Sequence, residues 1–269
     1  MHSNNNDFTL AELCITQCAE VWRDQGEVLA TGVGVLPRLG AGLALLTFNP
    51  DLLMTDGEAY LISEPVVLGP RSAQEIAVEG WMPYARTFDL LWHGRRHALV
   101  GPVQLDRYGQ MNISVIGDYL KPKAAILGVR GLAGNSISHM NSMFVPNHSK
   151  RCFVAGEVDM VCSAGFNPAR WSDGEIPANL SIGRVITDLA VLDFGGVSHA
   201  ARLLSLHPGI NLNQVLEATG FPLEFSSQTP ITTAPTKEQL LLIRERLDPY
   251  NLRATVFKND PPGDRRINT

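Results

Sequence analysis

A glycine-rich stretch, residues 101–135, constrains the fold of this chain more than any other part of its sequence. It contains an apolar run at residues 124–127, which predicts a strand, and Gly128, Gly131 and Gly134 follow that run. Glycine tolerates a positive φ and lets the backbone approach a ligand closely. The pattern therefore predicts a strand that ends in an open loop, where backbone amides can stabilise developing negative charge.

Strand and helix patterns alternate along most of the chain, which favours a parallel sheet covered by helices. Two helices begin with a predicted capping box, formed by Thr9 with Glu12 and by Thr236 with Gln239. The predicted helices cover residues 10–21, 36–46, 211–220 and 237–248; the predicted strands cover residues 27–34, 51–54, 97–105, 123–128, 151–161, 185–194 and 200–206.

The composition fits one α/β domain that spans residues 1–269. It includes 45% hydrophobic residues, 24 glycines and 17 prolines, enough for a well-buried core. We expect only the ends, residues 1–8 and 260–269, to be flexible. The net charge of −5 comes from interspersed acidic and basic residues, so the sequence predicts no face for nucleic acid.

The cysteines and the apolar windows predict a cytoplasmic protein that contacts no membrane. The four cysteines contain no C-x-x-C pair and are too few for a disulfide scaffold. The most apolar long window, residues 28–48, contains Pro37, Arg38 and several glycines, which argues against a membrane span. The first residues contain no apolar signal core. Cys14 and Cys18, four residues apart on an apolar helix face, are expected to pack in the core.

Several motifs of this chain resemble those of a known protein family and follow one another in the same order. They are LDRYGQMN (residues 105–112), IGDYLKPK (116–123) and GVRGLAG (128–134), with further matches at residues 32–41, 69–72, 147–151 and 243–249. Together they resemble the β subunits of the class I, glutaconate-type coenzyme A transferases, over about residues 26–250. Within that family, the segments are most similar to the β subunits of bacterial CoA-ester hydrolases that open the last steroid ring during cholesterol breakdown.

This resemblance implies an α/β fold with an open, mostly parallel sheet of the CoA-transferase type. It also implies a heterotetramer, in which the chain pairs with an α-type subunit and the active site lies between the two. The implied substrate is an acyl-CoA thioester, with no cofactor or metal. The implied reaction is hydrolytic cleavage of a carbon–carbon bond in a steroid-derived cyclic β-keto acyl-CoA.

The family's transferases use a glutamate of the β subunit as nucleophile, and this chain departs from that pattern. The closest gapless position holds Asp56, while Glu58 and Glu64 are displaced from it. Because an aspartate is one methylene shorter, and misplacing a reacting atom by about 1 Å costs catalysis steeply, the departure favours hydrolysis. Asp56, Glu58 and Glu64 remain the candidate catalytic carboxylates, and we expect the main base on the partner subunit.

The resemblance also assigns substrate binding to the glycine loop and to the polar residues after it. Arg130 stands where the family loop more often has a small residue, so its guanidinium pairs a substrate carboxylate or braces the loop. Asn135 and His139 either contact substrate oxygens or satisfy the loop backbone. His148 is expected to brace structure. The candidate substrate-binding residues are Gly128, Arg130, Gly131, Gly134, Asn135 and His139.

Two alternatives stand beside the hydrolase. One is a true CoA transferase that moves CoA between dicarboxylic acids through a glutamyl thioester. The other is a non-catalytic partner that only stabilises an active α subunit.

Overall fold

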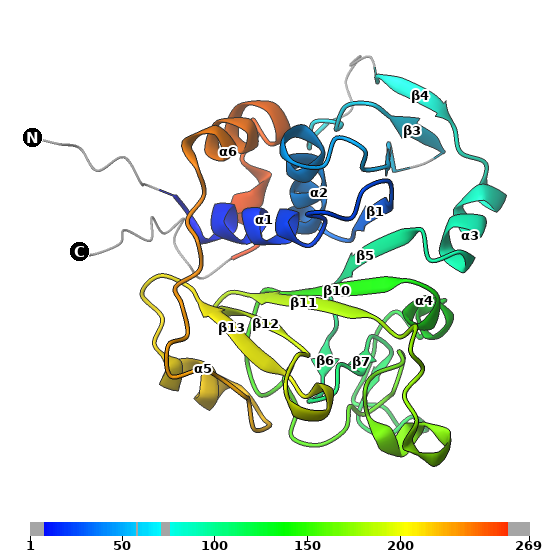
Figure 1. Ribbon diagram of the computed structural model, residues 1–269, viewed down its shortest axis with the longest axis vertical. Coiled ribbons are helices and arrows are strands. Elements are labelled where there is room, and N and C mark those ends of the chain that lie inside the picture. Colours follow the sequence, from blue (N-terminus) through cyan, green and yellow to red (C-terminus); the bar gives the residue numbers. More distant parts are fainter. Residues whose placement is uncertain (1–7, 58, 71–75, 258–269) are drawn as a thin grey trace, which may run out of the picture. The chain divides into compact units, whose positions relative to one another are not determined.

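The computed structural model describes residues 8–57, 59–70 and 76–257, and Figure 1 shows helices and strands intermixed along the chain. The α/β class is therefore confirmed. The described residues form two compact units, the first from within residues 8–90, 95–100 and 233–257, the second from residues 91–94 and 101–232. The single domain over residues 1–269 stays a prediction. Of the ends expected to be flexible, residues 1–7 and 260–269 lie outside the described residues, whereas Phe8 is buried.

The first unit contains the N-terminal elements and the C-terminal helices: α1 (Leu10–Glu20), β1 (Leu29–Gly32), α2 (Val35–Thr47), β2 (Met54–Thr55), β3 (Tyr60–Ile62), β4 (Val78–Trp81), most of α3 (Tyr84–Trp92), β5 (Arg96–Val100), α6 (Lys237–Leu241), η4 (Leu242–Leu247) and η5 (Leu252–Thr255). Strands β1 and β5 pair in parallel, while β2, β3 and β4 form an antiparallel sheet. The parallel pair agrees with the pairing expected from the alternating pattern.

A tight turn connects β1 to α2. A Cβ added to Gly32 would lie 2.4 Å from the carbonyl carbon of Pro37, so only glycine fits there. Gly34 has a φ of +106° and begins the helix, a conformation that other residues rarely adopt. These two glycines explain the GVG sequence of residues 32–34.

Helix α1 packs against α2 (Figure 1), and nearly all of its residues are buried. Gly40 permits this close approach, because a Cβ there would lie 2.6 Å from the Cβ of Cys18. Cys14 and Cys18 are fully buried, which confirms their predicted place in the core. Burial raises the pKa of the Cys18 thiol well above its ordinary value, so this residue stays a neutral packing group.

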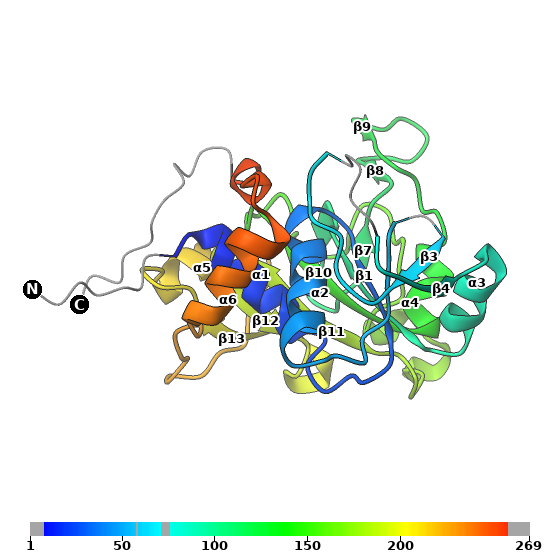
Figure 2. The same cartoon turned by 90° about the horizontal axis from the view of Figure 1, so that it is seen from above.

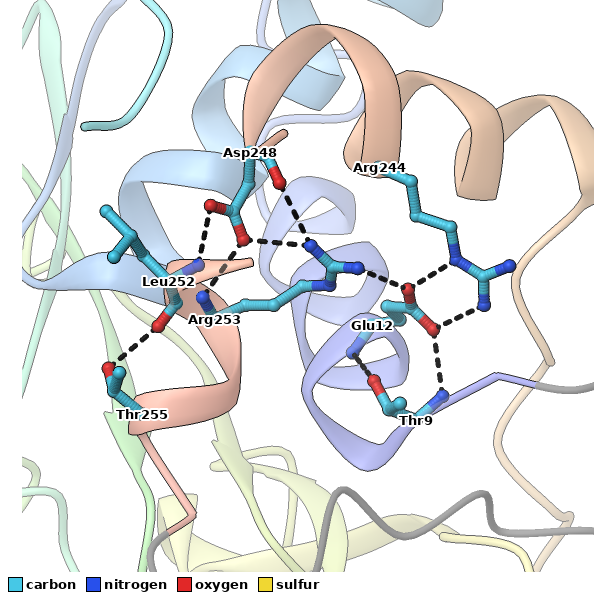
Figure 3. Close-up of polar contacts among 7 residues, drawn as sticks. All are labelled: Thr9, Glu12, Arg244, Asp248, Leu252, Arg253 and Thr255. Atoms are coloured by element: carbon cyan, nitrogen blue, oxygen red, sulfur yellow. Dashed lines mark hydrogen bonds and ion pairs between the residues drawn. The ribbon is translucent and has the colours of Figure 1, made fainter. Parts of the chain in front are cut away.

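Glu12 in α1 is the centre of a buried polar network that joins the N-terminal helix to the C-terminal segment (Figure 3). Arg244 donates to its two carboxylate oxygens at 2.7 and 3.0 Å, and Arg253 lies 3.2 Å from the same carboxylate. The backbone N–H of Thr9 also donates to Glu12, at 2.9 Å, so the predicted capping box is confirmed. Asp248 bonds Arg253 at 2.9 Å and completes the network.

The predicted C-terminal helix is confirmed, but it changes its winding part of the way along. It begins as α6 at the capping box of Thr236 and Gln239 and continues as the π-helical turn η4. Leu247, at the end of η4, packs near α2: a Cβ on Gly42 would lie 2.9 Å from its side chain.

The second unit contains β6 (Gln104–Leu105), β7 (Met111–Asn112), β8 (Val115–Ile116), β9 (Ala124–Ala125), α4 (Leu132–Ser138), β10 (Met140–Val145), η1 (Pro168–Arg170), η2 (Ser172–Gly174), β11 (Ile182–Thr187), β12 (Ala190–Asp193), η3 (Val197–His199), β13 (Arg202–Leu206) and α5 (Leu212–Ala218). Strands β10 and β11 are parallel, and β12 and β13 continue this sheet in antiparallel fashion. Two short hairpins, β6–β7 and β8–β9, complete the unit. Figure 2 shows the β8–β9 hairpin projecting from the rest of it.

The turn of the β6–β7 hairpin explains part of the LDRYGQMN motif. The buried Asp106 accepts the backbone N–H groups of Tyr108 and Gln110 at 2.9 and 3.0 Å, which holds the turn. Gly109 has a φ of +79°, and a Cβ there would lie 2.8 Å from the side chain of Ile182. Both the conformation and the packing therefore require glycine at this position.

His148 braces the interior of the second unit, as predicted. Its two ring nitrogens lie 3.1 and 2.9 Å from the hydroxyls of Thr187 and Thr219. Its ring stacks on Phe153 with the centroids 3.9 Å apart. Burial, with a smaller contribution from the nearby His207, lowers the pKa of His148 to about 3, so the ring is neutral at physiological pH.

Several of the predicted strands need correction. Residues 97–105 form β5, which ends at Val100, and then the two-residue β6 of a different sheet. Residues 123–128 form only the two-residue β9, exposed and antiparallel to β8. Residues 151–161 form no strand in the part of the chain described here, because turns interrupt them and Gly156 has a φ of +92°. Residues 185–194 form a hairpin, in which β11 ends at Thr187 and β12 begins at Ala190.

Over the described residues, no helix combines the length and apolar character needed to cross a membrane. The same part of the chain contains no group of three or more His, Cys, Asp or Glu side chains placed to hold a metal ion.

Candidate functional site

The loop between β9 and α4 is open, as its glycines suggest. Gly128 has a φ of +78°, and a Cβ added there would meet no described atom within 4 Å. A Cβ on Gly134 would also meet none, and one on Gly131 would come no closer than 3.6 Å to Asn135. Gly134 lies inside α4, where glycine costs roughly 1 kcal/mol relative to alanine. The conformation explains Gly128, but packing among the described residues explains neither Gly131 nor Gly134.

Arg130 occupies the middle of this loop with an unusual backbone. Its φ is +56°, in the left-handed region that non-glycine residues seldom adopt, and its side chain is exposed. Its Nε donates to the carbonyl of Leu127 at 3.1 Å. Since this bond uses only Nε, the terminal nitrogens keep a planar pair of donors of the kind that binds carboxylates. Loop bracing and substrate binding are therefore compatible.

The polar residues after the loop satisfy backbone groups at the end of α4. The carbonyl of Asn135 accepts the backbone N–H of His139 at 3.2 Å. His139 is buried, and its Nδ1 lies 3.0 Å from the carbonyl oxygen of Met140. Because a carbonyl only accepts, Nδ1 of His139 carries a proton in this contact. Contact of Asn135 and His139 with substrate stays a prediction.

Asn141 belongs to the same polar stretch of the sequence, and like Asn135 and His139 it is expected either to contact substrate oxygens or to satisfy the loop backbone. It is buried, and its Nδ2 donates to the carbonyl of His139 at 2.9 Å. Its buried Oδ1 has no hydrogen-bond partner among the described residues. A buried polar atom of this kind is costly, and contact of Asn141 with substrate stays a prediction.

Asp56, which the sequence comparison predicts at the position of the family nucleophile, is only 3% exposed. Its Oδ1 accepts the backbone N–H of Tyr60 at 3.2 Å, and its own N–H donates to the Tyr60 carbonyl at 3.0 Å. The residue thus closes the turn between β2 and β3. A carboxylate held by a turn and shielded from solvent is a poor nucleophile, since it must be free to reach an acyl carbon.

The two displaced carboxylates differ from Asp56. Glu64 has a side chain that is 58% exposed and forms an ion pair with Arg246 of η4. Glu58 lies outside the described residues. Their catalytic roles stay predictions, and Glu64 is the more accessible of the two described candidates.

The candidate residues fall into two groups. All of the substrate-binding candidates belong to one continuous segment of the second unit, residues 128–139, whereas Asp56 and Glu64 belong to the first unit. The candidate substrate-binding residues are therefore close together because they belong to one short segment.

An aromatic surface forms a further feature that the sequence reasoning missed. Tyr84, Phe88 and Trp92 follow one another at every fourth position of α3, with 78%, 44% and 68% exposure, and Trp81 of β4 is 70% exposed. Four-residue spacing places the three helical residues on one face. Exposed large aromatic side chains are typical of protein interfaces, and their helical spacing was the signal in the sequence.

No protein-family model matches the chain, but curated proteins do. The IpdB subunit of the cholesterol ring-cleaving hydrolase from Mycobacterium tuberculosis (strain ATCC 25618 / H37Rv) is 43% identical over 247 residues, which cover 91% of this chain and 97% of that protein. The β subunit of glutaconate CoA-transferase from Acidaminococcus fermentans is 30% identical over 242 residues, covering 83% of this chain and 87% of that protein.

Solved structures give the same result. The crystal structure of Rhodococcus jostii RHA1 IpdAB matches with a TM-score of 0.85 and 39% identity, covering 93% of this chain and 98% of that chain. The decarboxylase AibA/AibB matches with a TM-score of 0.76 and 27% identity, covering 93% and 99%. The predicted CoA-transferase type of fold, with its mostly parallel sheet, is confirmed by these similarities.

Proposed function

Because the chain belongs to the β-subunit family of the class I coenzyme A transferases, in the branch that contains the IpdB subunits, we propose that it is the β subunit of a heteromeric CoA-ester hydrolase. This enzyme opens the last ring of a steroid-derived cyclic β-keto acyl-CoA during steroid catabolism. The observation that carries the proposal is the 43% identity to an IpdB subunit over 91% of this chain. The transferase relative is similar over a smaller share, 83%.

The reaction we propose is a hydrolytic carbon–carbon cleavage. A general base removes a proton from water, and the oxygen bonds to the ring ketone carbon. As the tetrahedral intermediate collapses to a carboxylic acid, the ring bond breaks and its electron pair passes to the carbon next to the thioester. The resulting enolate is then protonated. One water is consumed, and the ring is opened without loss of CoA.

The glycine loop is proposed to contact the CoA thioester. Gly131 and Gly134 leave space that no described side chain fills, which supports a close approach by substrate. Backbone amides of residues 128–134 would then stabilise the enolate oxygen. Each such donor typically contributes about 3 to 4 kcal/mol to lowering the barrier.

Arg130 is proposed to bind a substrate carboxylate, such as the carboxyethyl arm of a ring fragment. Its Nε is held by the carbonyl of Leu127, which supports this role because the side chain is already ordered before substrate arrives. A preorganised guanidinium loses less entropy when it forms a two-bond contact.

The state of Asp56 supports hydrolysis over transfer. A transferase needs a carboxylate that attacks the acyl carbon, yet Asp56 is buried and bonds the backbone of Tyr60. We propose that water is the nucleophile in place of Asp56. We propose that the general base that activates it belongs to an α-type partner subunit.

The partner subunit is proposed to complete a heterotetramer in the cytoplasm, without cofactor or metal. The aromatic surface of α3 and β4 supports the need for a partner, because single chains seldom expose several large aromatic residues close together. The purified chain alone is expected to show no turnover.

A single experiment tests the proposed function. The chain is purified with its α-type partner and given a cyclic β-keto acyl-CoA in ¹⁸O-labelled water, with no acyl acceptor present. The proposal expects substrate loss and one ¹⁸O atom in the new carboxylate. No reaction until a free carboxylic acid is added, followed by release of an acyl-CoA of that acid, would instead establish the transferase.

A non-catalytic, stabilising role is the third possibility, and variants of the loop test it. If the chain only stabilises its partner, Arg130→Ala and Asn135→Ala complexes will keep full turnover. A large fall in turnover by an intact complex excludes that role.

A further inference from the structure

A cavity of about 290 Å³ lies beside the turn of the β6–β7 hairpin, within the second unit. None of the residues that line this cavity belongs to the glycine loop or to α4, residues 126–138. The cavity is therefore separate from that segment. The lining residues are Asp106, Arg107, Tyr108, Gly156, Glu157, Asn167, Gly220, Phe221 and Pro222.

The walls of this cavity are fixed by backbone hydrogen bonds. The carbonyls of Arg107 and Tyr108 accept N–H groups from distant parts of the chain at 2.9 and 2.8 Å. The N–H of Gly220 donates to the carbonyl of Phe153 at 2.8 Å, and a Cβ on Gly220 would lie 2.3 Å from that oxygen. Small-molecule sites are usually formed in advance in this way.

Both acidic side chains of the lining already have partners. Glu157 forms a two-bond ion pair with Arg170, with Nε donating to Oε1 at 2.8 Å. Asp106 accepts the backbone N–H groups of Tyr108 and Gln110. Among the described residues, neither carboxylate therefore forms an ion pair with the remaining cation of the lining.

That cation is Arg107. Its buried Nε has no hydrogen-bond partner among the described residues. The guanidinium carbon lies 5.5 Å from the ring centre of Tyr108, a distance at which the ring face attracts it. A buried donor without an acceptor is costly, and a ligand oxygen would supply the acceptor.

We propose that this cavity binds a small organic carboxylate, which pairs with Arg107 and packs its apolar part against Phe221 and Pro222. Guanidinium and carboxylate match in a planar, two-bond geometry. Phe221 is 8% exposed and offers an apolar wall next to the charge.

The two acidic side chains of the lining favour a ligand with one negative charge over a phosphate. Asp106 and Glu157 share the lining with Arg107, so the single guanidinium can pair with one negative charge, while a second charge on a dianion would face these carboxylates without a cation of its own. The volume also lies near the lower end of the range for small-molecule sites. A compact aromatic or aliphatic acid satisfies both conditions.

Asp106 adds a dependence on pH. Burial, with a smaller contribution from the charge of Glu157, raises the pKa of Asp106 to about 7 against the opposing backbone hydrogen bonds. The groups that face it are Arg107, Tyr108 and Glu157 of the lining, with Arg170 beside Glu157. Below pH 7 Asp106 is neutral and the site favours an anion, whereas above pH 7 its negative charge weakens binding.

Binding of benzoate to the intact complex tests the proposal, with benzamide as a neutral probe of the same shape. By calorimetry or ligand-detected NMR, benzoate is expected to bind saturably, with a Kd on the order of 1 mM, and benzamide about tenfold more weakly. Benzoate binding should weaken about threefold or more between about pH 6 and pH 8. Equal binding of the two probes, or no saturable binding of benzoate, overturns the proposal.

Variants locate the site. Arg107→Gln is expected to weaken benzoate binding at least about tenfold, and Arg107→Lys less, because an ammonium keeps the charge without the planar pair of donors. Arg151→Gln, a control at an exposed arginine of the same unit, should bind as the unaltered chain does. Unchanged binding by Arg107→Gln, with its folding checked by circular dichroism, places the ligand elsewhere and refutes the assignment. Ring-opening activity is measured separately, so failure of one proposal leaves the other intact.

Discussion

Glu12 and Arg244 lie 232 residues apart in the chain, yet they form a two-bond ion pair in which the glutamate is buried and the arginine is 43% exposed. Burial raises the pKa of Glu12, but the hydrogen bonds from Arg244 and Thr9 and the charges of Arg244 and Arg253 lower it overall. A lowered pKa means that the ionised carboxylate stabilises the fold above about pH 4.5, and this contribution is lost as the pH falls through the lowered value.

The first prediction concerns this ion pair. Glu12→Gln should lower the free energy of unfolding at neutral pH by about 2 to 4 kcal/mol, because it leaves Arg253 near an uncharged partner in the interior. Urea unfolding of the purified chain measures this. Glu20→Gln is the control: Glu20 pairs with Arg23 at 2.6 Å on the surface, where the loss should stay below about 1 kcal/mol. Equal losses would contradict a special role for the buried pair.

The second prediction separates stability from activity at Gly134. Gly134→Ala should stabilise the chain by up to about 1 kcal/mol, because alanine favours the helix and its Cβ meets no described atom. Turnover of the complex should nevertheless fall, since the methyl group occupies the space proposed for substrate. Gly80→Ala, also in open space, is the control and should leave turnover unchanged. Full activity of Gly134→Ala would remove this part of the proposed thioester contact.

The third prediction tests Arg130 without straining the backbone. Asparagine tolerates the left-handed conformation, so Arg130→Asn should fold normally. It should lower kcat/KM about 10- to 100-fold for a substrate that bears the carboxylate arm. The same variant should show no such loss with a substrate that lacks the arm. A similar loss with both substrates would indicate that Arg130 only braces the loop.

The fourth prediction concerns Asp106. Its pKa of about 7 in the folded protein exceeds the ordinary 3.8, so the folded state binds more protons and stability falls as the pH rises from about 4 to 7. This loss amounts to up to about 2.5 kcal/mol between pH 5 and pH 8. Asp106→Asn cannot titrate and should lose that part of the pH dependence, as seen by urea unfolding at both pH values. Parallel profiles for the two proteins would count against a raised pKa.

The fifth prediction addresses a covalent intermediate. Hydroxylamine or borohydride added together with acyl-CoA should leave no modification on Asp56 or Glu64, because the proposed hydrolysis passes through no glutamyl thioester. Mass spectrometry of the digested chain is the measurement. An adduct on either carboxylate would restore the transferase, and Glu64→Gln or Asp56→Asn would then identify the nucleophile.

Local signals in the sequence predicted local structure well. The capping boxes of Thr9 and Thr236 are confirmed because their hydrogen bonds join residues three positions apart. The parallel pairing of β1 with β5 agrees with the long crossover between the strands, which contains α2 and α3. The family motifs likewise located the open glycine loop.

Long-range packing explains the failures. Residues 151–161 have the apolar content of a strand, but turns interrupt this segment. Its apolar residues Phe153 and Val158 are nevertheless buried. Strand β10 was missed because Asn141 and Ser142, although polar, are buried within it. The Ser142 hydroxyl accepts the backbone N–H of Arg184 at 3.2 Å, so it is satisfied by a partner that the sequence does not reveal.

For the candidate site, the sequence identified a segment but not its surroundings. The sequence places Gly131 and Gly134 in one short segment, but the free space around them depends on side chains that are distant in the sequence. Nor could the sequence show that the carboxylate of Asp56 would accept a hydrogen bond from the backbone N–H of Tyr60 and so be held in a turn.

The partners of Glu12 at positions 244 and 253 have a consequence for synthesis on the ribosome. Synthesis runs from the N-terminus, so α1 is made long before the two arginines, Arg244 and Arg253, that pair with its carboxylate. All residues of the second unit, by contrast, are present once position 232 has been made. The inserted middle of the chain can therefore fold first, whereas Glu12 of α1 lacks its two arginine partners until positions 244 and 253 have been made.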